Sequence, residues 1–240
     1  MPCMTVLMWV LVGLAVAAGP QSADEFTTAA GVVRITPVRH ASLMIEAAGT
    51  LIHVDPVGED NYRGRPQADL ILITHTHGDH LDAALIPKLR KPGAPVLGPE
   101  AILKSVPDAV VIRNGEQKQV GRWQIEAVPA YNLRRGPAPG RLYHEKGTGN
   151  GYVLTFGGKR FYISGDTEAI PEMKALREIE AAFICMNLPY TMTPAEAAEA
   201  VRGFRPRVVY PYHYRGTNLE EFQKAMAGTG IEVRLREWYP

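Results

Sequence analysis

The sequence predicts an α/β fold, a single-domain, four-layer αββα sandwich in which two sheets pack face to face with helices outside. From residue 32 onward, two β-rich halves follow one another, and each half also carries helical segments. No linker or low-complexity tract divides the 240 residues, of which 46% are hydrophobic. One domain, residues 25–240, is therefore expected after a distinct N-terminal segment, residues 1–24.

The first half opens with three short runs rich in β-branched residues, with Gly49 in one of the turn-length gaps, and this pattern predicts a meander. A continuous apolar run at 68–74 is typical of a strand covered on both faces. Helical and strand patterns then alternate. The predicted strands are 32–38, 41–48, 50–56, 68–74, 94–98, 109–113 and 123–130, and the predicted helices are 81–89 and 99–106.

A polar loop rich in glycine and proline, residues 132–151, separates this half from the second. The pair Gly157-Gly158 predicts a hairpin turn, and the apolar run 181–187 predicts a buried strand that contains Cys185. The remaining predicted strands are 151–156, 160–166, 207–214 and 231–238, and the predicted helices are 171–179, 193–204 and 218–228.

The charge composition argues against a nucleic-acid partner. The chain has 26 Lys and Arg against 25 Asp and Glu, a net charge of +1, and its basic residues are spread along the sequence. Proteins that bind nucleic acid usually gather basic residues into a patch or arm. A small-molecule substrate is expected instead, and the sequence does not predict the oligomeric state.

The first residues resemble a secretory signal. The segment from Thr5 to Gly19 carries no charge, and Ala15-Val16-Ala17 suits signal-peptidase cleavage. The apolar run is shorter than the roughly 20 residues that span a bilayer, so no stable membrane span is expected after cleavage. Secretion or a periplasmic location is the expectation, with an uncleaved membrane anchor or an incorrectly assigned start codon as alternatives. Cleavage would leave Cys185 as the only cysteine, without an internal disulfide.

The segment "THTHGDH", Thr74 to His80, has the ligand density of a metal site. Side chains two residues apart in an extended segment point the same way, so His75 and His77 can reach one ion beyond the strand end. Asp79 and His80 follow the turn at Gly78 and reach a different point. One tetrahedral ion would be crowded by four ligands from six residues, so the spacing predicts a binuclear site.

Other candidate ligands follow later strands. Asp166 in "ISGDT" and His213 in "YPYHYRG" stand at strand ends, and His144 lies in the long loop. His53 alternates with apolar residues inside a strand, a pattern more typical of a half-buried structural histidine.

The motifs "THTHGDH", "SGDT" and "YHY" resemble, in order, those of metallo-β-lactamase-fold hydrolases. "GDT", the pair Thr191-Met192 before a helix, and the late "HY" are similar to the branch near the ascorbate-phosphate lactonases and N-acylphosphatidylethanolamine phospholipase D. The resemblance covers nearly all of the chain after residue 24 and implies the fold of this superfamily and a metal-dependent hydrolytic activity.

Carried over by motif, the resemblance implies that His75 and His77 bind the first ion, Asp79, His80 and His213 the second, and that Asp166 bridges them. Many relatives have a first-site histidine where this chain has Asn132, which is a poor zinc ligand. His144 is the free histidine between that point and Asp166, and we assign it as the replacement. The residues expected to orient the ligands, with strand-end capping or local packing as the alternative, are Asp55, Thr74 and His40.

Two divalent ions, zinc or alternatively manganese or iron, would supply a hydroxide near neutral pH, and Asp79 would orient it. No G-x-S-x-G nucleophile motif is present. Two other functions remain open on the same fold: a redox protein that carries iron, as an oxygenase or reductase does, and a non-catalytic periplasmic binding protein.

The loop 132–151 also indicates a substrate class. If His144 is a ligand, the loop passes near the metals and brings cationic side chains toward the substrate, which favours a small anionic ester, lactone or phosphodiester. The alternative is a solvated surface. Tyr190, Tyr212 and Tyr214 are expected either to line an opposing wall or to pack. The predicted substrate-binding residues are Arg134, Arg135, Arg141 and Lys146.

Overall fold

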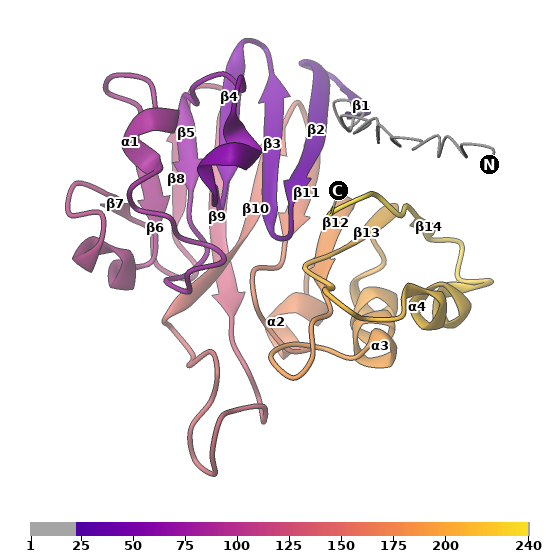
Figure 1. Ribbon diagram of the computed structural model, residues 1–240. Coiled ribbons are helices and arrows are strands. Elements are labelled where there is room, and N and C mark those ends of the chain that lie inside the picture. Colours follow the sequence, from indigo (N-terminus) through magenta and orange to yellow (C-terminus); the bar gives the residue numbers. More distant parts are fainter. Residues whose placement is uncertain (1–22, 240) are drawn as a thin grey trace, which may run out of the picture.

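The computed structural model describes residues 23–239. Two seven-stranded sheets face each other, with helices on their outer sides (Figure 1). Each sheet is formed by one continuous part of the chain, since the first contains β1 to β7 in order and the second contains β8 to β14 in reverse order. The predicted αββα sandwich is therefore confirmed.

The first sheet begins as an antiparallel meander and ends as a parallel sheet. Strands β1 to β4 pair antiparallel, and β4 to β7 pair parallel. The β3–β4 turn places Ala48 and Gly49 at φ 48° and 78°, a conformation that glycine adopts without strain. The strands are β1 (Asp24–Thr28), β2 (Gly31–Arg39), β3 (Ser42–Ala47), β4 (Thr50–Val54), β5 (Leu70–Leu72), β6 (Val96–Gly98) and β7 (Val110–Val111).

The second sheet repeats this arrangement. Strands β8 to β11 are antiparallel, and β11 to β14 are parallel. The predicted hairpin turn at Gly157 and Gly158 joins β10 to β11. The strands are β8 (Gln117–Val120), β9 (Trp123–Ala130), β10 (Gly149–Phe156), β11 (Lys159–Ile163), β12 (Ile179–Cys185), β13 (Val208–Tyr212) and β14 (Glu232–Val233).

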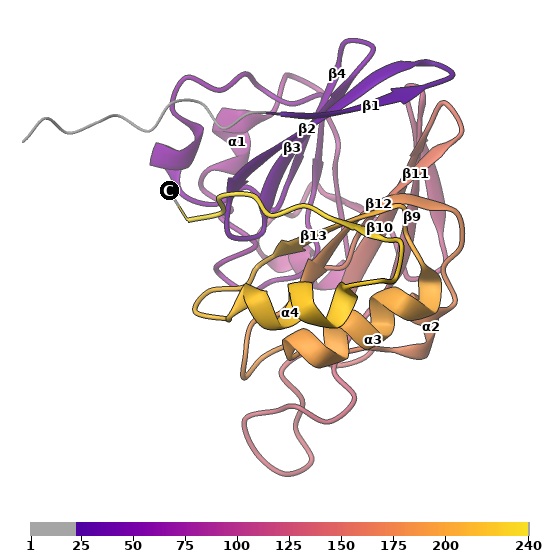
Figure 2. The ribbon, with the colours of Figure 1, turned by 90° about the vertical axis from the view of Figure 1, so that its right-hand side faces the viewer.

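The helices cover the outer faces. Figure 2 shows α2, α3 and α4 gathered beside β12 and β13. Thr193 caps α3 with a capping box, because its side chain accepts from Glu196 N–H while the Glu196 carboxylate accepts from Thr193 N–H. The helices are the 3₁₀ turns η1 (Glu59–Tyr62) and η2 (Glu100–Lys104), and α1 (Ile86–Leu89), α2 (Pro171–Lys174), α3 (Pro194–Phe204) and α4 (Leu219–Met226).

The main core fills the space between the sheets. Phe26 of the first sheet and Phe161 of the second meet edge to face with ring centroids 5.4 Å apart. Trp123 is fully buried beside Phe156. A smaller cluster on the outer face of the first sheet includes Ile71, and both clusters keep the strand ends at fixed positions.

Several elements differ from their prediction. Predicted helix 81–89 begins only at Ile86, because residues 83–85 form a turn in which the Asp82 side chain accepts from Leu85 N–H. Predicted helix 99–106 is the 3₁₀ turn η2, predicted helix 171–179 is the four-residue α2, and predicted strand 231–238 is reduced to β14. Strands β1 and β8 were not predicted. The edge strand β8, "QKQV", has no buried residue, so it lacks the apolar alternation that would indicate a strand.

Residues 1–22 of the predicted signal segment lie outside the described residues. Asp24 already belongs to β1, where it pairs with Arg236. Among residues 23–239, no helix combines the length and the apolar character that a membrane crossing needs.

Candidate metal centre

The candidate ligands come from both sheets and meet at one edge of the sandwich. The loop His75–His80 follows β5 of the first sheet. Asp166 follows β11 and His213 follows β13 of the second sheet. Because β4 to β7 and β11 to β14 are parallel runs, the carboxyl ends of their strands present these side chains at the same edge.

Within the described residues, three groups of side chains offer ligand atoms that lie within 4.8 Å of one another. The first two groups share no residue and mark two sides of the centre, and the third shares His75 with the first. The groups are His75, His77 and His144; His40, Asp79 and His213; and His75, His80 and Asp166.

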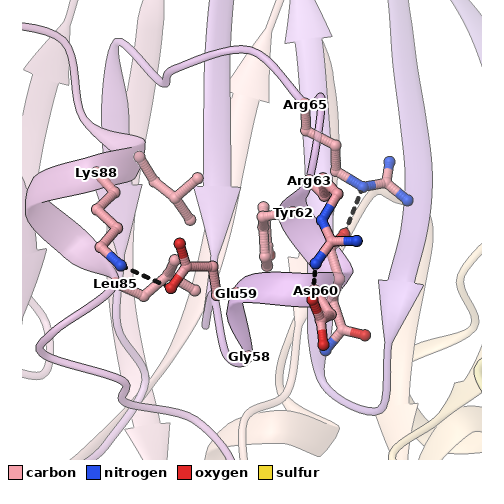
Figure 3. A pocket seen from close by; sticks show the side chains of 10 residues that line it. Gly58, Glu59, Asp60, Tyr62, Arg63, Arg65, Leu85 and Lys88 are labelled. Carbon is pink, nitrogen blue, oxygen red and sulfur yellow. Dashed lines mark hydrogen bonds and ion pairs between the residues drawn. The ribbon is translucent and has the colours of Figure 1, made fainter.

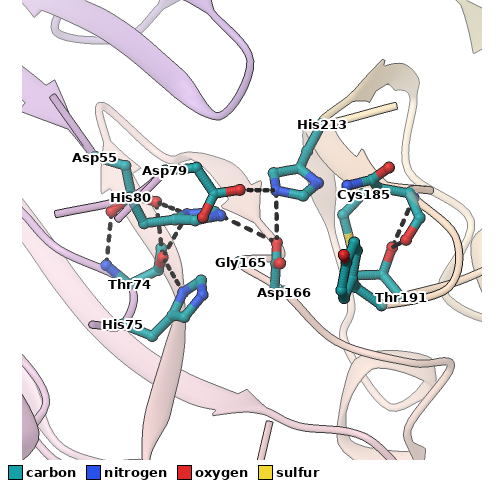
Figure 4. Close-up of polar contacts among 12 residues, drawn as sticks. Asp55, Thr74, His75, Asp79, His80, Gly165, Asp166, Cys185, Thr191 and His213 are labelled. Atoms are coloured by element: carbon teal, nitrogen blue, oxygen red, sulfur yellow. Dashed lines mark hydrogen bonds and ion pairs between the residues drawn. The ribbon is translucent and has the colours of Figure 1, made fainter. Parts of the chain in front are cut away.

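Asp166 faces His80 and His213 (Figure 4) and also His144. Its Oδ2 is 3.4 Å from His144 Nε2, and its Oδ1 is 3.4 Å from both His80 Nε2 and His213 Nε2. One carboxylate oxygen therefore faces each side, as a ligand shared by two ions would.

The polar atoms that face this space lack hydrogen-bond partners. In the part of the chain that the structure describes, Asp166 Oδ1 and the Nε2 atoms of four buried histidines are buried without a partner. An unpaired buried polar atom costs about 1–3 kcal/mol, so five of them around one space indicate a missing ligand. Nitrogen and carboxylate oxygen are donors that zinc accepts, and the residues therefore fit divalent ions. The four histidines are His75, His80, His144 and His213.

Asp55 and Thr74 orient two of these histidines from behind. The fully buried Asp55 carboxylate accepts from Thr74 N–H at 2.8 Å and from Thr74 Oγ1 at 2.7 Å, and its Oδ2 lies 2.7 Å from His80 Nδ1. Thr74 Oγ1 also lies 3.0 Å from His75 Nδ1. Occupying both Nδ1 atoms turns the two Nε2 atoms toward the centre.

Asn132 holds His144 in the same way. Its Oδ1 accepts from the His144 backbone N–H at 3.0 Å and lies 2.5 Å from His144 Nδ1. The Asn132 amide Nδ2 in turn donates to Tyr190 O at 2.8 Å. The sequence did not indicate this role: Asn132 orients His144, the histidine predicted to replace a ligand at the Asn132 position.

His40 lies closer to the centre than its predicted supporting position implied. Its Nε2 is 3.0 Å from Asp79 Oδ2, and its ring centroid is 3.9 Å from that of His213. His40 and His213 both have left-handed backbones, with φ of 55° and 49°, and His213 N–H donates to His40 O at 3.1 Å. The two residues thus fix each other's position.

The electrostatics favour the protonation states that metal ligands need at His75, Asp166 and Asp79, but not at His80. Burial opposes protonation of His80, but the charges of Asp166 and Asp55 outweigh it and hold the His80 pKa well above its usual range. Burial, followed by the charge of His80, holds the pKa of His75 well below its usual range, so His75 is neutral. Burial opposes ionisation of Asp166, but the charges of His213 and His80 outweigh it and hold the Asp166 pKa well below its usual range. Burial likewise opposes ionisation of Asp79, whose pKa is nevertheless lowered by its contacts with His213 and His40.

Gly165 lets the chain turn into Asp166. Its φ is +59°, and a Cβ there would lie 2.7 Å from Asn150 O and 3.3 Å from Thr74 Cβ. A side chain at this position would therefore displace Asn150 of β10 and Thr74, the residue before the loop His75–His80.

Two small hollows open at the centre. One, about 40 Å³, lies at His77, Tyr143 and His144. The other, about 100 Å³, is lined by His40 and Asp79 and also by Arg39 and Arg215, two exposed arginines that the sequence did not indicate. His77 and Asp79 are exposed, so the centre is accessible from solvent.

A larger hollow of about 750 Å³ lies elsewhere, around η1 and α1 (Figure 3). It touches none of the candidate ligands. Four of its charges pair with one another, Lys88 with Glu59 at 2.6 Å and Arg63 with Asp60 at 2.5 Å, and Arg65 donates to Asn61 O at 2.8 Å.

The predicted substrate-binding cations occupy different surroundings. Arg135 pairs with Glu168 at 2.5 Å and with Glu196 at 2.7 Å, and Arg134 also pairs with Glu196. Lys146 pairs with Glu172 at 2.9 Å, and Arg141 is exposed. Figure 1 shows their loop extending beyond the ends of β9 and β10. Their role in substrate binding stays a prediction.

The aromatic residues divide between packing and surface. Tyr212 is fully buried beside Trp238, whereas Tyr190 is exposed and contacts the Tyr143 ring with centroids 4.9 Å apart. Tyr214 is partly buried against the core.

Two facing sheets with histidines and aspartates gathered at one edge define a metal-dependent enzyme class, and sequence comparison agrees. The family described as "Beta-lactamase superfamily domain" matches residues 34–213. A UPF0173 metal-dependent hydrolase of Methanopyrus kandleri is 30% identical over 222 residues, which cover 85% of this chain and 95% of that protein. The chain therefore belongs to the metallo-β-lactamase superfamily and is a metal-dependent hydrolase.

Solved structures agree with this assignment. A protein of Parabacteroides distasonis named as a metal-dependent hydrolase is 44% identical, with a TM-score of 0.86 over 91% of this chain and 100% of its own. Igni18, a metallo hydrolase of Ignicoccus hospitalis, is 24% identical with a TM-score of 0.72 over 87% of this chain and 96% of its own, and shows the fold alone.

Proposed function

We propose that this hydrolase uses two divalent ions, zinc in the first instance, to hydrolyse an ester, lactone or phosphodiester of a small anionic molecule. The position of Asp166 carries the proposal, because its two oxygens face two separate sets of nitrogen ligands at 3.4 Å. His75, His77 and His144 would hold the first ion, and Asp79, His80 and His213 the second.

The ions, when bound, supply Lewis acidity and lower the pKa of water at the centre. The chain supplies the remaining features. Asp79 has a half-exposed side chain, 46% accessible, at the mouth of the centre, where its carboxylate can accept a hydrogen bond from the attacking water and orient it. Asp55, Thr74 and Asn132 fix the rings behind the ligand atoms.

Cys185 fits the role of a nucleophile poorly. Cys185 is fully buried, and burial raises the pKa of its thiol to about 12. Its Sγ donates to Thr167 O at 3.5 Å. A buried, protonated thiol cannot attack a substrate at the surface, which favours water as the nucleophile.

The preference for an anionic substrate is supported by Arg39 and Arg215. Both line the hollow that contains Asp79. A guanidinium beside the centre can bind a carboxylate or phosphate group of the substrate.

Metal analysis tests the two-ion centre. Elemental analysis of the purified protein should find two ions per chain, without visible absorption if they are zinc. Asp79→Asn should retain the fold but lower kcat by at least about 100-fold on whichever ester, lactone or phosphodiester is the best substrate in a panel. An iron-coloured protein without hydrolytic activity would favour the redox alternative, and metal binding without any turnover would favour a binding protein.

Paired variants test the substrate charge. We expect Arg39→Ala with Arg215→Ala to lower kcat/KM for an anionic ester by about 10-fold or more relative to its neutral analogue, an effect that weakens with salt. Arg134→Ala with Arg135→Ala is the matched control, and a selective loss in that control instead would favour the loop predicted from the sequence. Equal effects on both esters in both double variants would contradict the anionic preference.

A further inference from the structure

The segment after β14 runs back across the molecule toward β2 and β3 (Figure 2). Trp238 anchors it, because its indole is fully buried against Tyr212 and Phe183, with ring centroids 5.7 Å and 6.3 Å away. His40 N–H donates to Trp238 O at 3.0 Å, so this segment is bonded directly to the residue beside Asp79.

Tyr239 then contacts the His40 side chain. Its hydroxyl lies 2.7 Å from His40 Nδ1, while the other ring nitrogen, Nε2, lies 3.0 Å from Asp79 Oδ2. The same Asp79 oxygen is 3.5 Å from His213 Nε2. A continuous line of polar contacts therefore runs from Tyr239 through His40 to the second-ion side of the centre.

The Asp79 carboxylate at the end of this line determines which atoms of His40 and Tyr239 carry the hydrogens. An ionised carboxylate can only accept, so His40 Nε2 must carry a hydrogen and donate it to Asp79. A neutral imidazole has one N–H, which leaves Nδ1 as an acceptor, and the Tyr239 hydroxyl is the donor within reach. Without that donor, only the contact with Asp79 would favour the hydrogen on Nε2, and the tautomer with its hydrogen on Nδ1 would become accessible with loss of that contact.

We propose that Tyr239 is a positioning residue for the second ion: by donating to His40 Nδ1, it fixes the tautomer in which His40 holds Asp79 next to His213. This inference rests on the proposed two-ion centre. It assigns His40 as a hydrogen-bond donor to Asp79 and not as a ligand, although its Nε2 is near enough to Asp79 and His213 for either role.

Three variants separate these roles by metal affinity. Tyr239→Phe should weaken binding of the second zinc ion by about 10-fold and leave the first unchanged, because only the orientation of Asp79 is lost. Tyr214→Phe is the matched control, since Tyr214 packs against the Tyr239 ring at 5.1 Å and its hydroxyl donates to Arg236 O. His40→Gln keeps an N–H near the Nε2 position and should retain the second ion.

The double variant gives the sharpest result. If Tyr239 acts through His40, Tyr239→Phe should have no further effect on zinc affinity in the His40→Gln protein. Equal zinc affinities for the Tyr239→Phe and Tyr214→Phe proteins would overturn the proposal. So would additive losses, or loss of the second ion from the His40→Gln protein, which would make His40 a ligand.

NMR of the metal-free chain tests the role of Tyr239 independently of the two-ion proposal, because the His40 tautomer can be measured without bound metal. Nitrogen shifts should show His40 protonated at Nε2 in the wild type and a mixture of tautomers in Tyr239→Phe. That result would stand even if the protein bound one ion, whereas an unchanged tautomer would overturn the role of Tyr239 whatever the metal count.

Discussion

His53 lies inside β4 with its ring fully buried, where Nε2 donates to Pro66 O at 3.0 Å and Nδ1 has no partner. The prediction of a structural histidine agrees with this position. Burial lowers its pKa from 6.5 to about 4. Between about pH 6.5 and 4, His53 is therefore neutral in the folded protein but protonated in the unfolded chain. The contribution of His53 to the free energy of unfolding is lost as the pH falls through this range.

We expect His53→Gln to remove this pH dependence. Between about pH 7 and about pH 5, the free energy of unfolding of the wild type should fall by about 2 kcal/mol more than that of the variant. Glutamine keeps an N–H for Pro66 O, so the comparison isolates the titration. Urea unfolding of both proteins at the two pH values measures the difference, and parallel pH profiles would refute it.

Asn132 and His144 have different proposed roles, since His144 would bind the first ion and Asn132 would orient the His144 ring. His144→Ala should remove a ligand and with it tight binding of the first ion. Asn132→Ala should keep the ligand but release its orientation, which lowers first-ion affinity by about 10–100-fold. Zinc titration with elemental analysis distinguishes the two. A His144→Ala protein with two tightly bound ions and full activity would show that the ligand assignment is wrong.

At the scale of elements, strands were predicted where burial leaves an apolar pattern. The two longer helices, α3 and α4, were also predicted, whereas the short helices were predicted too long. Strands β5 and β12 are buried throughout and were evident from sequence. The four-residue helices α1 and α2 depend on tertiary packing, so their ends could not be read from helical periodicity. The candidate ligands of residues 75–80 could be predicted from the sequence because they lie close together in it. The contacts of Asn132, Arg135 and Tyr239 join distant segments, and no local pattern encodes them.

Gly165 allows a prediction about the connection after β11. Gly165→Ala should destabilise the fold by about 1–2 kcal/mol through its left-handed backbone, and by a further ~1–3 kcal/mol because its Cβ would press on Asn150 O. Gly158→Ala is the control, since its φ is +81° but a Cβ there meets nothing within 4 Å. Urea unfolding should rank Gly165→Ala clearly below Gly158→Ala, and equal stabilities would contradict the steric argument.

At the scale of the whole molecule, export remains a proposal that rests on the uncharged segment from Thr5 to Gly19. Cleavage near Ala17 would leave the described domain intact, because β1 starts at Asp24. Mass spectrometry of the protein from its native cells should find a mature terminus within a few residues of Ala17, in the secreted or periplasmic fraction. An intact Met1 terminus in the cytosol would exclude export by this route.

The contact between Tyr239 and His40 also has a consequence for protein synthesis. The ribosome synthesises β2 early, but Tyr239, which contacts His40, is added only 199 residues after His40. Translation proceeds from the N-terminus, so a nascent chain can present the motif of residues 75–80 long before Asp166, His213 and Tyr239 exist. A product that stops before Asp166 would thus expose the histidines of residues 75–80 without the other candidate ligands, and it should bind metal less tightly than the chain that contains Asp166 and His213.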